Sequence, residues 1–272
     1  MTSGLSTPSR PQYADDLDLL VEAAKAAGRE AMTYFRNDVK IWWKNEGTSP
    51  VTAADHAAND VLKHRLLSAR PDYGWLSEES EDSAERLSRH AVFIVDPIDG
   101  TRAFMAGKDT WVVSAAVTMG GLPVAGVLYA PALDELYVAT ADGLVEKNGE
   151  PLALAGHKPG EPIRISAADD MVKALRAPVN AQLERMSRIP SLAYRLAMIA
   201  DGRLDATLVK PNAHDWDLAA ADLILRNAGG RLTNLAGEAL LYNTPIPRHN
   251  VLVAADAGLH RAILAAFPGG TH

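Results

Sequence analysis

The stretch Ala91-Val-Phe-Ile-Val-Asp96-Pro-Ile-Asp99-Gly100-Thr101 decides how the rest of the chain is interpreted. Its apolar, β-rich first half predicts a buried strand that ends at Asp96 in a tight turn. Asp96 and Asp99 can converge across this turn with the Ile98 carbonyl on a hard divalent cation such as Mg2+. Gly100 and Thr101 then offer backbone N–H groups, at a possible helix N-terminus, for a phosphate. A purely structural turn is the competing interpretation, because Asp-Gly turns after strands are common.

The composition is that of an ordinary soluble globular protein, with 272 residues, 47% of them hydrophobic and 22% charged. This length allows one large domain or two subdomains that share a core. Residues 1–13 are polar at their start and lack the apolar segment of a signal peptide, so they are expected to form a disordered tail. No apolar run approaches the roughly 18 residues of a membrane span. A cytoplasmic protein with no membrane contact is therefore expected.

The chain contains no cysteine and carries a net charge of −7. Without thiolates, any metal must be held by oxygen or imidazole ligands. The acidic balance argues against a nucleic acid polymer as a partner, because a duplex binder needs a basic face. An acidic enzyme that takes an anionic phosphate ester must bring cations to its site, and bound Mg2+ meets that requirement.

The first half of the chain predicts two helices and an antiparallel sheet. Helical spacing of apolar residues covers 15–35 and 54–69. Residues 44–50 are expected to be a polar linker and 83–89 a loop or short helix. The β-rich segments are 40–43, 73–77, 91–95, 111–119, 123–129 and 135–140, with a hairpin at Asn148-Gly149. The later strands predict a meander packed against the two helices.

The second half returns to alternating elements beyond a candidate boundary at residues 156–161. Its expected strands are 163–166, 205–209, 231–233 and 251–255, and its expected helices are 168–176, 191–200, 218–227 and 257–267. This order predicts a layered α/β (α+β) fold. Residues 14–156 would form an N-terminal α+β subdomain with most metal ligands. Residues 157–268 would form a C-terminal α/β subdomain that supplies Asp217 and substrate contacts.

Further carboxylates stand at the ends of predicted elements. Glu78 directly follows its strand, as Asp96 does, so two strands of one sheet can present them side by side. Asp217 and Asp55 each lie in the first turn of a helix, where capping alone would explain an acid. Without metal, the four acids Glu78, Asp96, Asp99 and Asp217 would repel one another and raise their pKa values. Two divalent cations bridged by Asp96 would neutralise them, as in a two-metal phosphatase.

These motifs resemble those of the inositol monophosphatase family of Mg2+-dependent, lithium-sensitive phosphatases. The matching segments are Val51-Thr-Ala-Ala-Asp55, Glu78-Glu79-Ser80, Asp96-Pro-Ile-Asp-Gly-Thr101 and Trp216-Asp217-Leu-Ala-Ala220, in family order. The resemblance implies a five-layer αβαβα sandwich and two or three Mg2+ ions per site. It also implies inhibition by Li+ and, because dimers are common among relatives, a homodimer.

The resemblance assigns roles to the acidic residues and to the turn that follows them. One Mg2+ would be bound by Glu78, Asp96 and the Ile98 carbonyl, and the second by Asp96, Asp99 and Asp217. Glu78 and Thr101 would orient the attacking water, with Thr101 steadied by Asp55. Gly100 and Thr101 would bind the phosphate.

The sequence differs at two places from the motifs of family members that act on inositol phosphate, and these differences indicate the substrate. Members acting on inositol phosphate carry Asp-Gly-Thr-Thr-Asn-Phe and an acid about seven residues before the last metal ligand. This chain has Asp99-Gly-Thr-Arg-Ala-Phe104 and Lys210 instead. A cation in place of an acceptor favours a substrate with a second phosphate. Gly126-Val-Leu-Tyr-Ala-Pro131 and Ser191-Leu-Ala-Tyr-Arg195 resemble segments of bacterial 3'(2'),5'-bisphosphate nucleotidases.

The predicted activity is Mg2+-dependent hydrolysis of a small phosphate ester, most closely the 3'-phosphate of adenosine 3',5'-bisphosphate. Asp99, Arg195 and Lys210 are the expected substrate contacts, with solvated surface cations as the alternative for the last two. Inositol 1-phosphate and histidinol phosphate stay open as substrates. A non-catalytic phosphate-ligand sensor with the same fold is the alternative of another class, and the intact acid set argues against it. His214, near the site, could contact substrate or pack in the core.

Overall fold

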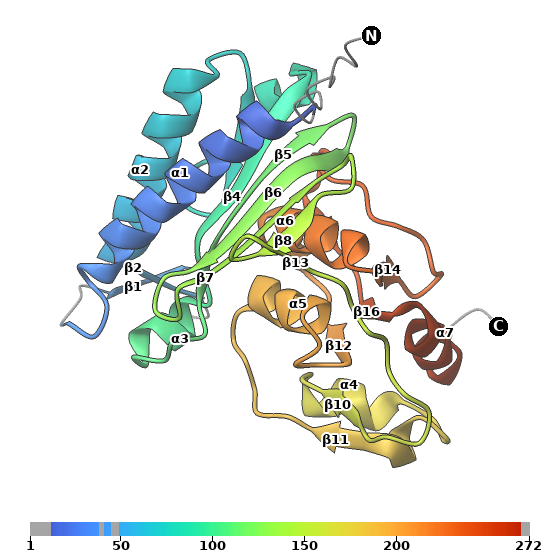
Figure 1. Ribbon diagram of the computed structural model, residues 1–272. Coiled ribbons are helices and arrows are strands. Elements are labelled where there is room, and N and C mark those ends of the chain that lie inside the picture. The colour runs from blue at the N-terminus through green and yellow to red at the C-terminus, as the bar shows by residue number, and fades with distance from the viewer. Residues whose placement is uncertain (1–11, 38–40, 45–48, 268–272) are drawn as a thin grey trace, which may run out of the picture.

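The computed structural model describes residues 12–37, 41–44 and 49–267, and in them helices and sheets form five layers (Figure 1). The layers are α1 with α2, a seven-stranded sheet, α5 with α6, a five-stranded sheet, and α4 with α7. The αβαβα sandwich implied by the motifs is confirmed. Of the expected tail, residues 1–11 lie outside the described residues, and Gln12 and Tyr13 form a turn before α1.

The first layer packs two long helices, α1 (Ala14–Met32) and α2 (Ala53–Ala69), against the large sheet. The strands β1 (Ile41–Lys44) and β2 (Ser49–Thr52) pair antiparallel before α2. The expectation of a polar linker over residues 44–50 is therefore wrong at both of its ends, and residues 45–48 lie outside the described residues. Extended pairing with β1 makes Ser49 and Pro50 part of an edge strand, a position that a proline tolerates.

The seven-stranded sheet has the strand order β3-β4-β5-β6-β7-β8-β9. The strand β3 (Gly74–Ser77) runs parallel to β4 (Ala91–Asp99), and the short 3-10 helix η2 (Ala84–Ser88) connects them. The remaining strands form the expected antiparallel meander: β5 (Val112–Met119), β6 (Leu122–Ala130), β7 (Glu135–Thr140), β8 (Val145–Lys147) and β9 (Glu150–Pro151).

Strand β4 is buried on both faces, which explains its unbroken apolar run. Phe93 and Val95 pack in the core beneath α1 and α2, whereas Val92 and Ile94 pack in the core that contains α5 and α6. The expectation that this strand ends at Asp96 is wrong, because β4 continues to Asp99. Its register against β5 shifts between Asp96 and Asp99, so Pro97, which has no N–H group, lies where the ladder is irregular.

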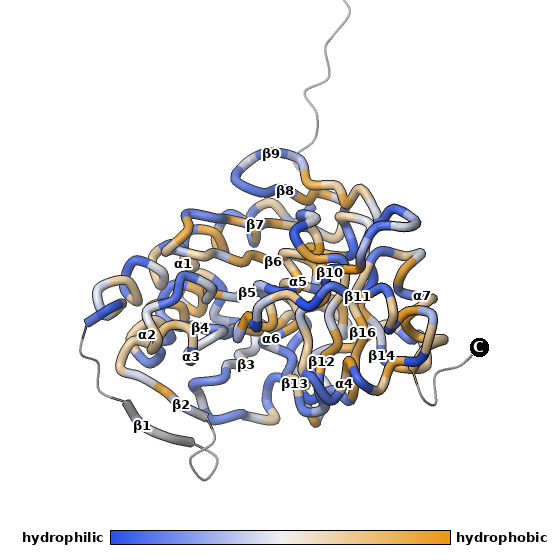
Figure 2. The backbone as a smooth tube through the Cα atoms, turned by 90° about the horizontal axis from the view of Figure 1, so that it is seen from below, coloured by the Kyte–Doolittle hydropathy of each residue, from blue (hydrophilic) through white to orange (hydrophobic). Residues whose placement is uncertain are grey.

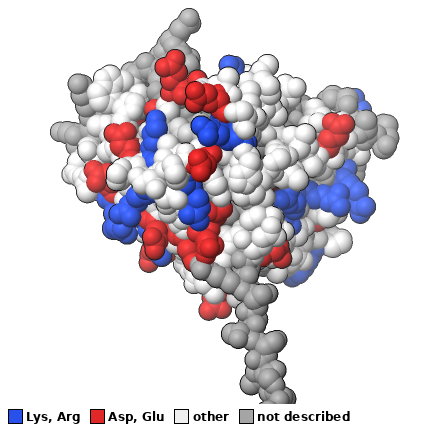
Figure 3. Space-filling model, turned by 90° about the horizontal axis from the view of Figure 1, so that it is seen from above, with Lys and Arg blue, Asp and Glu red and all other residues white. Residues whose placement is uncertain are grey.

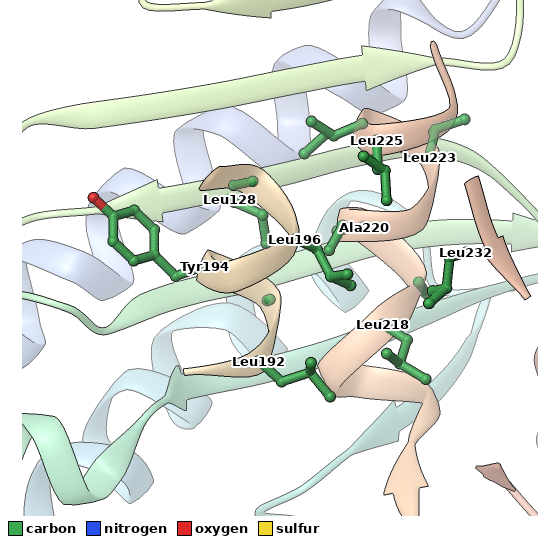
Figure 4. Packing of buried hydrophobic residues seen from close by; sticks show 14 of the residues in the cluster. Leu128, Leu192, Tyr194, Leu196, Leu218, Ala220, Leu223, Leu225 and Leu232 are labelled. Carbon is green, nitrogen blue, oxygen red and sulfur yellow. The ribbon is translucent and has the colours of Figure 1, made fainter. Parts of the chain in front are cut away.

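The middle layer consists of α5 (Leu192–Ala200) and α6 (Asp215–Asn227), which are buried between the two sheets. Figure 4 shows Leu196 of α5 and Leu218 and Ala220 of α6 among the apolar side chains packed there. A Cβ atom on Gly126 of β6 would lie 3.0 Å from the Ala220 Cα, so this glycine allows α6 to pack directly on the strand. The close approach fixes the position of α6, whose first turn carries Asp217.

The five-stranded sheet has the order β11-β10-β12-β16-β14, with β11 and β12 both parallel to β10, which lies between them. These strands are β10 (Ile163–Ile165), β11 (Leu183–Arg185), β12 (Ala206–Val209), β14 (Gly230–Asn234) and β16 (Leu252–Asp256). Its outer face is covered by α4 (Asp169–Ala174) and α7 (Ala257–Ala266). The smaller elements are α3 (Thr101–Met105), η3 (Asn180–Gln182), β13 (Ala213–His214) and β15 (Arg248–His249).

The predicted boundary at residues 156–161 lies between β9 and β10, and the division into two subdomains stays a prediction. The tube in Figure 2 is hydrophobic along several central strands and hydrophilic in many of the outer loops. Acidic and basic side chains are mixed over the face in Figure 3. In the part of the chain that the structure describes, no helix combines the length and apolar character that a membrane crossing requires.

Candidate metal centre

Three aspartates from two different elements meet at one end of the large sheet. Carboxylate oxygens of Asp96 and Asp99 on β4 and of Asp217 on α6 all lie within 4.8 Å of one another. Glu78 follows β3, whose Ser77 pairs with Val95 of β4, so Glu78 and Asp96 continue neighbouring parallel strands. The Glu78 N–H donates to the Val95 carbonyl at 3.4 Å. The arrangement of acids at strand ends that the sequence suggests is present in the fold.

Asp217 and Asp96 are oriented by backbone N–H groups close to them in sequence. The His214 N–H donates to Asp217 Oδ2 at 2.7 Å, which closes the first turn of α6. The Ile98 N–H donates to Asp96 Oδ1 at 2.9 Å, within the irregular part of β4. Each carboxylate is therefore held by one oxygen and keeps other lone pairs for a ligand.

Asp55 and Thr101 are joined beside the aspartates. Asp55 accepts hydrogen bonds from the Thr52 N–H at 2.7 Å and the Thr52 hydroxyl at 2.6 Å, completing a capping box on α2. The Thr101 hydroxyl lies 3.1 Å from Asp55 Oδ1 and 3.2 Å from the Ile98 carbonyl oxygen. The two explanations offered for Asp55, helix capping and support of Thr101, are thus compatible in one geometry.

Asp99 is bound by the N-terminus of α5, a contact that sequence reasoning missed. Its carboxylate accepts hydrogen bonds from the Ser191 hydroxyl at 2.6 Å, the Ala193 N–H at 2.6 Å and the Leu192 N–H at 3.3 Å. Gly100 has φ of 98°, and a Cβ atom there would lie 3.0 Å from the Ser191 Cβ, so a glycine is required. The only local signal was a serine at the first position of the expected helix 191–200, and it does not identify Asp99 as its partner.

Burial and mutual repulsion make these carboxylates hard to ionise. Burial raises the pKa of Asp96 well above its usual value, and the charges of Glu78 and Asp99 raise it further. The pKa of Asp217 is raised by burial and then by Asp99 and Glu78. Burial also raises the pKa of Asp99, against hydrogen bonds from Ser191 and Ala193, and raises that of Asp55 to about 6.

These residues fit a hard divalent cation. The converging donors are all carboxylate oxygens, which suit Mg2+ rather than a thiophilic metal. A cation placed among them would remove the repulsion that raises their pKa values. The acidic cluster is therefore a chemically consistent metal site.

The two cations expected to contact substrate lie in different environments. Arg195 on α5 is largely buried, and its Nη1 donates to Thr207 Oγ1 at 3.1 Å and to the Ser166 carbonyl at 3.4 Å. The alternative of a solvated surface cation is therefore wrong for Arg195. Lys210 is more exposed, and its Nζ lies 2.8 Å from Asp170. Both line one cavity, together with Arg188, which sequence reasoning did not select.

His214 and the turn after Asp99 complete the description of the site. The His214 ring stacks on Trp216, with centroids 4.4 Å apart and planes inclined by 4°. Burial lowers the pKa of His214, which favours a neutral, packed ring. Gly100 is the N-cap residue of α3, and Thr101 is the first residue of that short helix, as the sequence suggested.

Comparison with known proteins finds relatives that match most of the chain. The chain matches the model of the inositol monophosphatase family over residues 13–271. The inositol-1-monophosphatase of Mesorhizobium japonicum is 33% identical over 269 residues, covering 92% of this chain and 95% of that protein. The histidinol-phosphatase of Mycobacterium tuberculosis is 31% identical, covering 93% and 98%. The 3'(2'),5'-bisphosphate nucleotidase CysQ of Buchnera aphidicola is 26% identical, covering 84% and 87%.

A solved structure gives the same fold. The extragenic suppressor protein suhB from Bartonella henselae superposes with a TM-score of 0.82 at 28% identity, covering 94% of this chain and all of that one. The sandwich and the acidic cluster define a phosphoric monoester hydrolase of the metal-dependent kind. The chain belongs to the inositol monophosphatase family.

Proposed function

We propose that the chain is a Mg2+-dependent phosphomonoesterase whose ions are held by Glu78, Asp96, Asp99, Asp217 and the Ile98 carbonyl. The observation that carries this proposal is the convergence of three aspartate carboxylates within 4.8 Å at the ends of β4 and α6. When bound there, Mg2+ would supply Lewis-acid stabilisation of phosphoryl charge and acidify a water. Two or three ions and competition by Li+ belong to the same proposal, as does the homodimer.

The remaining residues would orient water and the phosphate. The Thr101 hydroxyl donates its proton toward Asp55 or the Ile98 carbonyl, so its lone pairs can accept a hydrogen bond from the attacking water. Glu78 would accept the second hydrogen bond from that water and, as the reaction proceeds, its proton. The N–H groups of Gly100 and Thr101 would donate to the phosphate oxygens.

The proposed substrate is adenosine 3',5'-bisphosphate, from which the enzyme would remove the 3'-phosphate. Support comes from Lys210 and Arg195, which give the neighbouring cavity a positive lining where an inositol-binding relative would carry an acid. Asp99 would contact the sugar part of the substrate. Inositol 1-phosphate is the second candidate, because identity to the M. japonicum inositol-1-monophosphatase is higher than to the nucleotidase CysQ.

Phosphate release from a panel of esters tests both levels of the proposal. Adenosine 3',5'-bisphosphate, inositol 1-phosphate and histidinol phosphate would be compared by kcat/KM with Mg2+ and after treatment with EDTA. We expect Mg2+-dependent release, fastest from the bisphosphate. A clear preference for inositol phosphate would overturn the nucleotide assignment, and binding of a phosphate ester without hydrolysis would favour the sensor.

The Glu78→Gln variant tests the role given to the side chain that faces the water. Loss of the carboxylate base is expected to lower kcat by about 100-fold or more. Glu81→Gln, in the exposed acidic run after Glu78, is the matched control. Turnover of Glu78→Gln within a few-fold of the wild type would contradict the mechanism.

A further inference from the structure

A basic pocket lies at the carboxyl edge of the five-stranded sheet. It has a volume of about 260 Å³, and its lining includes Ser166, Arg188, Pro190, Arg195 and Lys210. Ser166 directly follows β10 and Lys210 directly follows β12, while Arg188 and Pro190 belong to the segment between β11 and α5. The pocket therefore collects residues from the ends of three neighbouring parallel strands.

This position is one at which α/β sheets bind ligands. The connection from β10 to β11 passes through α4 on the outer face, and the connection from β11 to β12 passes through α5 on the inner face (Figure 1). After β10 the chain turns toward β11, whereas after the neighbouring strand β12 it turns the opposite way, toward β14. A crevice opens at such a switch point, outside the carboxyl ends of the strands.

The lining of the pocket is cationic, and its positive charges are only partly balanced by nearby acids. Its described lining residues include three cations, Arg188, Arg195 and Lys210, and no acid. Arg188 makes no hydrogen bond or ion pair with another described residue. Lys210 is paired with Asp170, but both side chains are more than half exposed, and solvent screens exposed pairs of this kind strongly. An anion in the pocket can therefore bind the side chains of Arg188 and Lys210 without breaking a strong existing interaction.

Arg195 supplies a buried donor without a partner. Its Nε is inaccessible to solvent and finds no acceptor among the described residues. Native proteins rarely leave such a group unpaired, because desolvation of a donor without a hydrogen bond is unfavourable. Burial lowers the pKa of Arg195, the charge of Asp99 opposes this, and the charge of Arg188 lowers the pKa further.

The first turn of α5 links the pocket to the acidic cluster, and the charges of Asp99 and Asp217 act on Arg195. Ser191, at the N-cap of that helix, donates to Asp99, and the Arg195 N–H donates to the Ser191 carbonyl one turn later at 3.3 Å. A volume near 260 Å³ is below the roughly 300–1,000 Å³ of pockets that enclose drug-sized ligands. It suits one compact anionic group of a molecule whose remainder extends toward the aspartates.

We propose that this pocket is a subsite for a second phosphate group of the substrate, which is bound and not hydrolysed, and that Arg188 is a specificity-determining residue. The inference rests on the proposed phosphomonoesterase activity and narrows its substrate class to small bisphosphorylated esters. Arg195 and Arg188 bind the second phosphate through their guanidinium groups. Lys210 leaves its ion pair with Asp170 and binds the same phosphate.

Matched substrate pairs test the subsite. Adenosine 3',5'-bisphosphate is compared with adenosine 3'-monophosphate, and inositol 1,4-bisphosphate with inositol 1-phosphate, so that only the second phosphate changes. We expect kcat/KM to favour the bisphosphate at least tenfold in one of the pairs. Equal kcat/KM values in both pairs, or a preference for the monophosphates, would overturn the subsite.

The Arg188→Gln variant tests whether Arg188 causes the preference for the bisphosphate over the monophosphate. We expect it to lower kcat/KM for the favoured bisphosphate at least tenfold more than for the matching monophosphate. The control is Arg185→Gln, a nearby exposed arginine that pairs with Asp169 and is outside the pocket lining. It should leave the ratio unchanged. An equal loss on both substrates with Arg188→Gln would contradict the specificity role, and circular dichroism establishes that the variant is folded.

Competition by the dephosphorylated product separates this subsite from the proposed activity. Adenosine 5'-monophosphate keeps the second phosphate and lacks the scissile one, so it should inhibit hydrolysis of adenosine 3'-monophosphate far better than adenosine does. Arg188→Gln should remove that difference. Absence of Mg2+-dependent phosphate release from every ester would refute the proposed function itself, whereas release without any effect of the second phosphate would refute only the subsite.

Discussion

The Ser191 hydroxyl donates a hydrogen bond of 2.6 Å to Asp99 Oδ2 and so joins the first turn of α5 to strand β4. The Ala193 N–H donates to the same oxygen at 2.6 Å. Asp99 is thereby held from outside its own strand, by a residue 92 positions later in the chain. Asp99 is a metal ligand in the proposed site, and removal of a group that orients such a ligand typically lowers metal affinity or activity by about 10–100-fold.

Ser191→Ala is expected to raise the Mg2+ concentration required for half-maximal activity by about 10–100-fold, because Asp99 loses its hydroxyl donor. Titration of phosphate release with MgCl2 measures this change. Ser191 also caps α5, accepting from the Tyr194 N–H at 3.0 Å. Asp256→Ala, which removes the N-cap of α7, therefore controls for the loss of a helix cap alone. A Mg2+ requirement equal to that of the control would disprove the role of Ser191 at the metal.

Asp217→Asn is expected to have opposite effects on stability and on activity. Without metal, it removes one of several repelling buried charges and should raise the thermal midpoint by a few degrees, at about 2–4 °C per kcal/mol for a chain of this size. It should also abolish the stabilisation by added Mg2+ and the phosphatase activity. Thermal unfolding in EDTA and in MgCl2 measures both effects. Asp72→Asn, at an exposed acid, should change neither, and destabilisation of metal-free Asp217→Asn would refute the repulsion argument.

Asp222 predicts a pH dependence of stability unrelated to metal binding. Burial raises its pKa from 3.8 to about 6, against the charge of Arg226 and a hydrogen bond from Tyr242. The folded state therefore binds this proton more tightly than the unfolded chain, and the resulting stability is complete below pH 3.8 and is lost as pH rises through 6. Relative to Asp222→Asn, the wild type should lose roughly 2 kcal/mol of unfolding free energy between pH 4 and pH 7. Urea unfolding at both pH values tests this, and a relative gain with pH would contradict it.

Glu135 holds a polar network between the large sheet and α5. Its carboxylate accepts hydrogen bonds from the hydroxyls of Tyr137 and Tyr194 at 2.8 Å each and from Arg203 at 2.9 Å. Glu135→Gln weakens these charge-assisted bonds and should lower the unfolding free energy by roughly 1–3 kcal/mol. Urea denaturation with an unchanged m-value would measure that loss. Glu150→Gln, at an exposed position of β9, should stay within about 0.5 kcal/mol of the wild type, and an equal result for Glu135→Gln would remove the network as a source of stability.

The parts of the site that sequence could predict are those determined locally. Glu78 and Asp96 each follow an apolar strand, and parallel pairing of β3 with β4 brings such positions together. Asp217 was identifiable because a helix begins around it. The full extent of β4 was not predictable, since Pro97 normally ends a ladder, and only the irregular pairing with β5 accommodates it.

The parts that sequence could not predict depend on packing between distant segments. Ser191 meets Asp99 only because α5 is placed under the large sheet by its apolar faces. Arg188 lies in an irregular segment after β11, with no motif around it, and gains meaning only from the pocket it shares with Arg195 and Lys210. Lys210 was selected from its spacing to Asp217, and its pairing with Asp170 was not visible in that spacing.

The middle layer of helices has a consequence for how the molecule unfolds. The side chains of α5 and α6 belong to one apolar cluster that also contains residues of both sheets, such as Ile94 and Leu252. Neither sheet can separate from this layer without exposing the apolar surface that the other sheet covers. Unfolding of one sheet would therefore expose the apolar face of the helix layer on which the other sheet packs. Both sheets should unfold together in a single cooperative transition, and neither sheet should persist as a folded fragment.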